Sequence, residues 1–380
     1  MEGIRAVGGW AGVNHSREKD RPASDGRRSG ACRRHRTRLF ARLFLAVLVA
    51  TPAGVIAQGG QTGTLLVVNR TGGSISLFDL DTKVEIARVP IGPVIPHEVA
   101  VSPDGRFALT SEYGPNDNPG RHLVVIDVAE GRQAGRIDLG PQSRPHSIVF
   151  MKDGQRAVAT LELSDRVALV DVLGRKVVRT YPTGGREGHM VRLSPDGTRA
   201  YVTSRGAAGT LSVISLETDK PPVVIPTGRG AEGLAVSPDG SEVWVVNRVE
   251  GTISIVDTRS LTVAATIEVP PDARRAEISA GGRVLVPHGG PPDSPAQFLS
   301  VYDLRRRVLI GRHAMHEGRK GPGGFGIHIV GERAFASDRA GQALLAMDLA
   351  NVATASAIAT GLDDPDGLAY SPVRVSVLKQ

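Results

Sequence analysis

Three histidines stand at the same position in three copies of a repeated sequence pattern. They are His97, His146 and His189, each five residues ahead of a short turn, and Glu232 holds this position in the next copy. Imidazole and carboxylate groups are the ligands that Zn²⁺ and related divalent metals take from proteins. Because equivalent positions of a repeat converge when the copies surround an axis, these four residues predict a metal site. The alternative is that the side chains only pack around a channel mouth and bind water.

Other copies of the repeat, and the ends of neighbouring strands, supply further candidates. Glu112 and Glu162 each end a predicted strand near the histidines, where a carboxylate can orient an imidazole or act as a general base. Five more residues are predicted to contact a ligand: Arg205, Arg274, His288, Asp338 and Asp366. Phe325 takes the histidine position in the remaining copy. A divalent metal ion is the only cofactor that this set indicates.

No established catalytic motif accompanies this cluster. The sequence contains no Walker loop, dinucleotide-binding glycine fingerprint, CxxC pair, HExxH helix or G-x-S-x-G elbow. The recurring aspartates have a structural explanation, because Asp before Gly shapes a tight turn and an Asp ending a strand caps the next turn. The first group comprises Asp104, Asp153, Asp196 and Asp239, and the second comprises Asp79, Asp127, Asp171, Asp257, Asp303 and Asp348.

The repeat itself predicts the fold. Pro96–Thr110 reads as a strand, a Ser-Pro-Asp-Gly turn and a second strand, since Pro presets φ and Gly accepts a positive φ. The pattern returns at Pro145–Thr160, Gly188–Thr203 and Ala231–Val246, and an aliphatic strand end recurs seven times at spacings of 42 to 48 residues. Seven units of four short strands predict an all-β fold, a seven-bladed β-propeller with four-stranded antiparallel blades. The isolated strand Asp366–Tyr370 is expected to complete the first blade beside Thr64–Asn69.

Two hairpins carry a recognisable signature. They read SPDGTRAYVTSR (Ser194–Arg205) and SPDGSEVWVVNR (Ser237–Arg248), and TLLVVNR (Thr64–Arg70) is a partial copy. From Thr64 to Pro372 the chain resembles the YVTN-repeat β-propeller family, within the lactonase-like and WD-type seven-bladed superfamily. The resemblance implies the propeller fold and leaves function open, because the family includes binding, scaffold and enzyme members. The fifth and sixth hairpins depart from the signature, with Ser279–Gly282 and Val330–Glu332 in place of SPDG.

The first 57 residues differ in composition from the rest of the chain. They carry eleven Lys or Arg against four Asp or Glu, whereas the other 323 residues hold 35 of each, which argues against nucleic-acid binding. A basic run before the apolar segment Leu39–Ala50, followed by small residues up to Ala57, is typical of a secretory signal. We expect cleavage near Ala57, a linker at 58–63, the propeller at 64–372 and a tail at 373–380; an uncleaved anchor is the alternative. The single cysteine, Cys32, would leave with the leader.

The long predicted loops lie on the same face as the titratable residues. They are Tyr113–His122, His288–Gln297 and Met315–Gly326, and elaborate loops on a rigid scaffold usually carry function. The first expectation is a periplasmic or secreted monomer that binds a small molecule, peptide or protein at this face. The second is an enzyme, for which the family resemblance implies lactone hydrolysis or a metal-assisted lyase or hydrolase. The third is a cell-surface or scaffold protein with an inert channel mouth.

Overall fold

The computed structural model describes residues 62–270, 272–290, 297–316, 326–351 and 355–376. All of these belong to one compact unit, Gln58–Gln380. The predicted leader, most of the linker and Phe325 lie outside the described residues, so those predictions remain untested. Within the described ranges, no helix is long and apolar enough to cross a membrane.

Seven four-stranded antiparallel sheets make up the described unit, each with the innermost strand given first. Blade 1 comprises β28 (Pro365–Ser371), β1 (Thr64–Asn69), β2 (Ser74–Asp79) and β3 (Glu85–Pro90). Blade 2 comprises β4 (Pro96–Val101), β5 (Phe107–Glu112), β6 (His122–Asp127) and β7 (Arg132–Asp138). Blade 3 comprises β8 (Pro145–Phe150), β9 (Arg156–Leu161), β10 (Arg166–Asp171) and β11 (Lys176–Pro182), with the 3₁₀ turn η1 (Glu162–Ser164) after β9.

The remaining four blades repeat this order. Blade 4 comprises β12 (Gly188–Leu193), β13 (Arg199–Ser204), β14 (Thr210–Ser215) and β15 (Val223–Pro226). Blade 5 comprises β16 (Ala231–Val236), β17 (Glu242–Asn247), β18 (Thr252–Asp257) and β19 (Thr262–Glu268). Blade 6 comprises β20 (Glu277–Ile278), β21 (Arg283–Gly289), β22 (Gln297–Asp303) and β23 (Val308–His316). Blade 7 comprises β24 (Ile327–Val330), β25 (Arg333–Asp338), β26 (Ala343–Asp348) and β27 (Ala355–Thr360).

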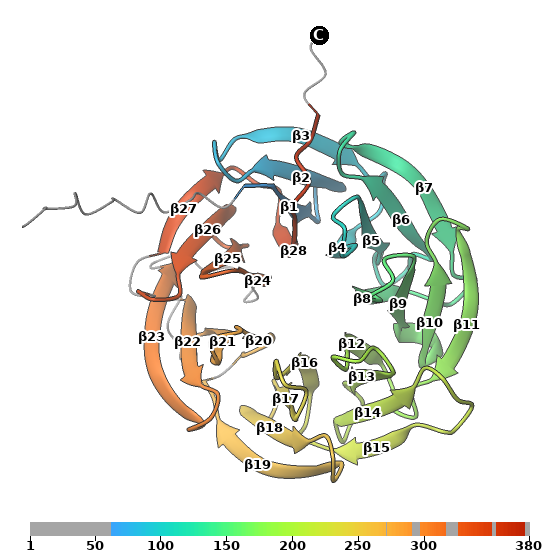
Figure 1. The fold of residues 1–380 in the computed structure, drawn as a ribbon, viewed down its shortest axis with the longest axis vertical. Coiled ribbons are helices and arrows are strands. Elements are labelled where there is room, and N and C mark those ends of the chain that lie inside the picture. Colours follow the sequence, from blue (N-terminus) through green and yellow to red (C-terminus); the bar gives the residue numbers. More distant parts are fainter. Residues whose placement is uncertain (1–61, 271, 291–296, 317–325, 352–354, 377–380) are drawn as a thin grey trace, which may run out of the picture. The chain divides into compact units, whose positions relative to one another are not determined.

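The blades form a ring in which the first strand of each blade faces the central axis (Figure 1). The apolar core lies between neighbouring blades rather than within one. One cluster, for example, joins Leu109 and Leu123 of blade 2 to Phe150 and Ala159 of blade 3. The second and third strands of a blade therefore bury both of their faces, as β1 and β2 do, which explains why they are rich in Val, Leu, Ile and Ala rather than strictly alternating. The predicted fold class is confirmed.

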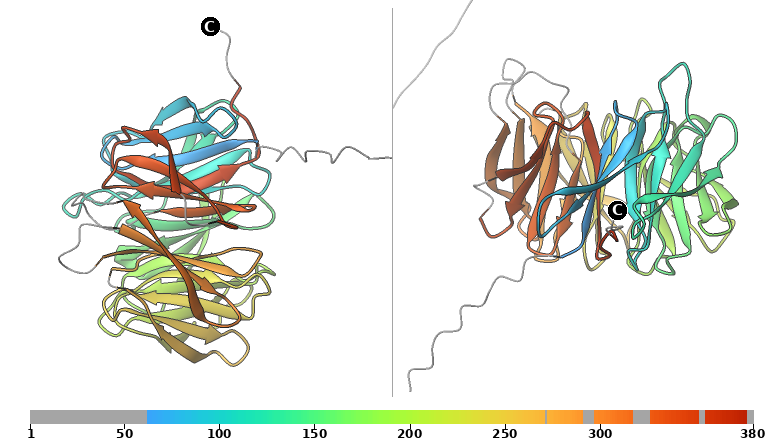
Figure 2. Two further views of the ribbon diagram at one scale, coloured as in Figure 1. Left: turned by 90° about the vertical axis from the view of Figure 1, so that its left-hand side faces the viewer. Right: turned by 90° about the horizontal axis from the view of Figure 1, so that it is seen from above.

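Ring closure follows the prediction as well. β28 pairs antiparallel with β1, with Leu66 opposite Ala369 and Thr64 opposite Ser371. The two strands lie side by side in the view from above, blue beside red (Figure 2). The segment after Ser371 continues along the propeller, because the Ser376 N–H donates to the Ala129 carbonyl. The predicted tail therefore begins with residues that pack against blade 2.

The turn aspartates act as predicted. In the hairpin of blade 4, Asp196 accepts hydrogen bonds from the Ser194 hydroxyl and the Thr198 N–H. At the end of β18, Asp257 accepts from the N–H groups of Arg259 and Ser260. These carboxylates are used to shape turns, which leaves the channel residues as the candidates for chemistry.

Candidate functional site at the channel mouth

A cavity of about 140 Å³ opens at one mouth of the central channel. It is formed by the beginnings of the innermost strands and by the residues that follow the second strands. Its lining comprises six arginines, three histidines, a tyrosine and two carboxylates: Arg70, Arg205, Arg248, Arg274, Arg275, Arg339, His97, His146, His189, Tyr113, Glu232 and Asp366.

A β-bulge at the start of the innermost strands aims two successive side chains at the channel. The pairing register of β4 with β5 shifts between Pro96 and Val99, and the same shift occurs between Pro145 and Ile148 in blade 3. Blade 4 repeats it between Gly188 and Val191. A bulge leaves extra residues outside the regular ladder and redirects their side chains. His97, His146 and His189 all lie in these bulges, as do the residues that follow them.

Threonine and serine hydroxyls on the second strands hold the bulges in place. Thr160 accepts a hydrogen bond from the Ser147 N–H at 2.9 Å and donates one to the His189 carbonyl of the next blade at 2.8 Å. Thr203 repeats this arrangement between the Met190 N–H and the Glu232 carbonyl. Each hydroxyl satisfies a bulged N–H and ties two blades together. The threonine of the repeat signature is thus a positioning residue for the histidines.

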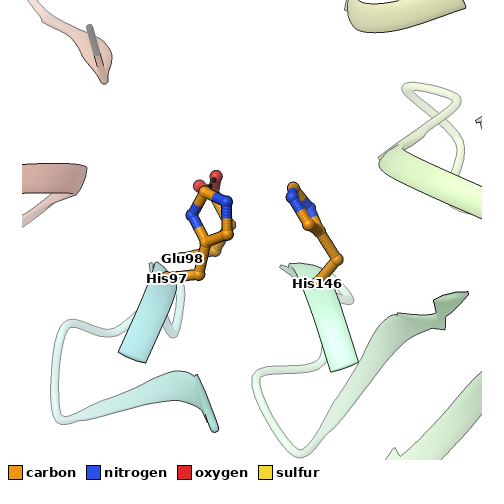
Figure 3. Close-up of side chains that lie close together, drawn as sticks. All are labelled: His97, Glu98 and His146. Atoms are coloured by element: carbon orange, nitrogen blue, oxygen red, sulfur yellow. Dashed lines mark ion pairs between the residues drawn. The ribbon is translucent and has the colours of Figure 1, made fainter. Parts of the chain in front are cut away.

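The three predicted histidines form a contiguous row. The ring centroids of His97 and His146 lie 4.3 Å apart, and those of His146 and His189 lie 3.7 Å apart. Figure 3 shows His97 and Glu98 projecting from β4 in the same direction as His146 from β8. Tyr113 packs edge-on against His97 and His146 at 5.0 and 5.3 Å. The predicted convergence of the imidazoles is therefore observed.

Burial keeps the inner imidazoles neutral. His146 is 1% exposed and His189 is 4% exposed. Burial lowers the pKa of His146 well below its usual value, and the neighbouring His189 and His97 act in the same direction. Burial also lowers the pKa of His189 to about 3, although Glu232 opposes the shift. Both ring nitrogens of His146 and Nδ1 of His189 are buried without a hydrogen-bond partner in the described structure.

Asp366 and Glu232 flank the row at its two ends. Nδ1 of His97 lies 2.9 Å from Oδ2 of Asp366, close enough for a charge contact although the approach angle is poor for a hydrogen bond. Burial favours protonation of Asp366, but His97 and Arg275 outweigh it and hold the pKa of this carboxyl well below its usual range. At the other end, Nε2 of His189 lies 3.8 Å from Oε1 of Glu232.

Glu162 lies beside the middle and last histidines. Its Oε1 accepts a hydrogen bond from Arg205 at 2.7 Å, and its Oε2 accepts one from the Tyr113 hydroxyl at 3.0 Å. Burial and the charge of Glu162 raise the pKa of Tyr113 to about 12, so the phenol remains a donor. Ligand atoms of His146, Glu162 and His189 all lie within 4.8 Å of one another, as do those of His97, Glu98 and His146.

Below this row, the side chain of Arg275 crosses the channel. It donates to Glu98 of blade 2, and its Nη2 lies 3.8 Å from Oδ1 of Asp366. Glycines make room at this level: a Cβ on Gly233 would meet the Arg274 carbonyl at 2.3 Å, and one on Gly367 would meet the His97 carbonyl at 2.7 Å. A second cavity of about 330 Å³ continues beyond, and Arg275 lines both cavities. The guanidinium therefore divides the channel.

The structure brings most of the predicted site residues together. The four predicted metal ligands line the cavity, with Glu162 in contact with two of its lining residues. Three of the predicted ligand-binding residues also line the cavity: Arg205, Arg274 and Asp366.

Three predicted residues lie elsewhere. Glu112 pairs with His122 and Arg136, and His288 contacts the Ser300 hydroxyl at 2.8 Å in blade 6. Asp338 accepts from the Gly341 N–H. Glu112, His288 and Asp338 are each the sixth residue from the start of a second strand, and the side chains that reach the mouth come from the seventh. Because successive side chains of a strand point to opposite faces, this difference of one residue decides whether a side chain reaches the channel mouth.

Several lining residues had not been predicted. Arg70, Tyr113, Arg248 and Arg339 occupy that seventh position. Their signal in the sequence was the arginine that follows the second strand in four of the repeats, Arg205 included. Arg275 and Glu98 each come one residue after a predicted site residue, Arg274 and His97 respectively. Strict strand alternation hides both residues. A bulge directs Glu98 into the channel beside His97, whereas Arg275 lies outside a regular strand, two residues before β20.

Comparisons with known proteins agree with this architecture. A family model described as "Lactonase, 7-bladed beta-propeller" matches residues 65–286. The antigen Lp49 of Leptospira interrogans serogroup Icterohaemorrhagiae serovar copenhageni is 23% identical over 197 residues, which cover 48% of this chain and 42% of that protein. The match thus spans less than half of that relative's length.

Two solved structures have the same fold. Hydrazine synthase of Kuenenia stuttgartiensis superposes with a TM-score of 0.60 at 19% identity, covering 68% of this chain and 77% of that one. A functionally unknown protein from Desulfotomaculum acetoxidans DSM 771 superposes with a TM-score of 0.65 at 16% identity, covering 83% of this chain and 100% of that one. At these identities the likeness concerns the fold alone.

Proposed function

Because this chain belongs to the lactonase family of seven-bladed β-propellers, we propose that it binds a small molecule with carboxylate groups at the mouth of its central channel. The observation that supports this proposal is the lining of the cavity, where six arginines surround neutral imidazoles. Arginine presents a planar fork of N–H donors that matches a carboxylate. The proposed ligand is a hydroxy acid or the corresponding lactone.

Unpaired donors indicate where such a ligand would bind. All six lining arginines already contact a carboxylate, as Arg248 and Arg274 do with Asp272. Nevertheless, the Nε atoms of Arg70 and Arg205 are buried without a hydrogen bond, and Nε of Arg205 comes no closer than 3.8 Å to Oε2 of Glu187. A buried donor without a partner costs free energy, roughly 1–3 kcal/mol, which an acceptor on a ligand would recover. A ligand with several acceptor oxygens fits this arrangement.

The test is calorimetric titration of the propeller with gluconate and succinate as probes. Arg205→Met and Arg339→Met are expected to weaken binding at least tenfold, since each removes a cavity donor. Arg306→Met is the matched control, because this arginine is exposed on blade 6. Failure of both probes to bind, or equal binding by all variants, would reject the proposal.

A second candidate function is hydrolysis of a lactone, and the contact between His97 and Asp366 favours it. A carboxylate beside an imidazole orients the ring and stabilises its protonated form. In this reaction His97 would take a proton from water, the water oxygen would attack the lactone carbonyl, and the ring C–O bond would break with the proton returned to the alkoxide. His97→Gln should then abolish turnover of δ-gluconolactone while gluconate still binds. Turnover equal to that of wild type would exclude this role.

We also propose that the chain is exported and cleaved near Ala57, on the basis of the basic and apolar segments of the leader. N-terminal sequencing of protein from the periplasm and the medium tests this proposal. A mature start at Gln58 is expected. Recovery of the full-length chain in a membrane fraction would support the uncleaved anchor instead.

A further inference from the structure

The buried imidazole of His146 has no internal explanation in the described structure. It is 1% exposed, and neither Nδ1 nor Nε2 has a hydrogen-bond partner. A neutral imidazole carries one donor and one acceptor, and the great majority of buried polar atoms in proteins are paired. Nδ1 of His189 is likewise buried without a hydrogen-bond partner. Two adjacent imidazoles with unpaired nitrogens indicate that something binds between them.

We propose that His146, His189 and Glu162 bind one divalent transition-metal ion, most suitably Zn²⁺. Their ligand atoms lie within 4.8 Å of one another, and small rotations of the side chains would place them about 2.0–2.2 Å from a shared ion. Two imidazoles and a carboxylate suit zinc better than Ca²⁺ or Mg²⁺, which prefer oxygen ligands. The proposed ion would lie in the same cavity as the small molecule of the proposed function. Its binding does not depend on whether that small molecule binds.

Neighbouring residues hold the three ligands in place. The Tyr113 hydroxyl and Arg205 fix the Glu162 carboxylate, which retains further lone pairs on both oxygens. Thr160 fixes the backbone of His189, and Glu232 lies 3.8 Å from the same imidazole. Such outer partners orient ligands and strengthen metal binding. Arg205 also adds positive charge near the ion, which Glu162 and Glu232 offset.

The second group with metal-binding spacing is less suitable. It consists of His97, Glu98 and His146. Glu98 is bound to Arg275, and His97 contacts Asp366. Binding an ion there would break the contact that crosses the channel and leave the buried Arg275 guanidinium without its main partner. The set with Glu162 keeps that contact intact.

Three protein ligands leave a coordination position open. In metal sites of this kind the remaining position is taken by water or by a ligand atom. His146 and His189 line the arginine-rich cavity, so the open position would be accessible to an anion bound there. The ion and the arginines would then act on the same ligand.

The experiment uses the propeller freed of metal by a chelator and dialysed into metal-free buffer. Zn²⁺ is titrated by calorimetry and Co²⁺ by visible absorption, whose intensity reports the coordination geometry. Wild type is expected to take up one ion per chain. His146→Ala and His189→Ala should lose this binding, and Glu162→Gln should weaken it at least tenfold. His288→Ala is the matched control, because His288 is a buried histidine of another blade whose nitrogens contact Ser300 and Gly289.

Three results would overturn the assignment. The first is absence of uptake by wild type. The second is uptake that His146→Ala leaves unchanged while circular dichroism shows that both proteins are folded. The third is loss of the ion in His97→Ala with retention in His189→Ala, which would place it on the other group. Gluconate binding measured with the chelator present separates the two proposals. If gluconate binds and Zn²⁺ does not, the metal inference alone fails.

Discussion

Arg275 and Glu98 are 177 positions apart in the chain and ion-pair across the central channel. Arg275 precedes β20 of blade 6, and Glu98 belongs to β4 on the opposite side of the ring (Figure 1). Both side chains are largely buried, with 14% and 13% exposure. Blades 2 and 6 share no strand pairing. The ion pair therefore links two sheets of the ring that have no backbone hydrogen bonds to each other.

Disruption of this pair is expected to destabilise the propeller strongly. Arg275→Met and Glu98→Gln should each lower the free energy of unfolding by about 3–5 kcal/mol, because each leaves a buried charge without its main partner. The double variant should lose clearly less than the sum of the single losses. Urea denaturation followed by circular dichroism measures all three. Arg121→Met is the control, because its pair with Asp138 is exposed to solvent and should contribute little to stability. Additive losses would show that the two residues do not act as a pair.

Loss of the Thr160 hydroxyl is also expected to destabilise the propeller. Thr160→Val keeps the shape of the side chain but leaves the Ser147 N–H and the His189 carbonyl without this partner. We expect a loss of about 1–3 kcal/mol in the free energy of unfolding. Thr218→Val, at an exposed turn, should change it by less than about 0.5 kcal/mol. Equal stability of the two variants in urea would contradict the role of Thr160 as a tie between blades.

The fold could be predicted because its signals are local. Each SPDG turn is defined within four residues, and strand ends such as Asp127 and Asp171 fixed the period. The row of histidines was predictable for the same reason, since His97, His146 and His189 share one offset from their turns. These features need no knowledge of contacts between distant segments.

The rest of the site depends on geometry that the period does not show. Glu98 reaches the channel because a bulge interrupts the alternation of side chains in β4, and Arg275 reaches it from irregular backbone before β20. Glu112 was expected at the mouth, but the side chain that arrives there is the next one, Tyr113. Pairing between opposite blades, as in Arg275 with Glu98, depends on the diameter of the ring and on the small residues around the axis.

The closing strand should carry a large share of stability for its length. Leu368 of β28 is 7% exposed and packs with Leu65 and Val67 of β1 and with Phe335 of blade 7. Leu368→Ala should lower the free energy of unfolding by about 2–5 kcal/mol, as expected for a buried leucine. Leu173→Ala is the matched control, because Leu173 is 62% exposed. If both variants unfold at the same urea concentration, the burial of Leu368 contributes nothing to the stability of the closed ring.

The turn residue Asp196 gives a prediction that depends on pH. The Ser194 hydroxyl and the Thr198 N–H lower the pKa of Asp196 from 3.8 to about 2. A lowered carboxyl pKa in the folded state means that its contribution is complete above about pH 4 and disappears as the pH falls through about 2. Asp196→Ala should therefore cost about 1 kcal/mol or less near pH 7, since the group is exposed, and less near pH 3. Urea denaturation at both pH values measures the difference, with Asp117→Ala in an exposed loop as the control. A deficit that stays the same at both pH values would mean that the charge of Asp196 contributes nothing to the turn.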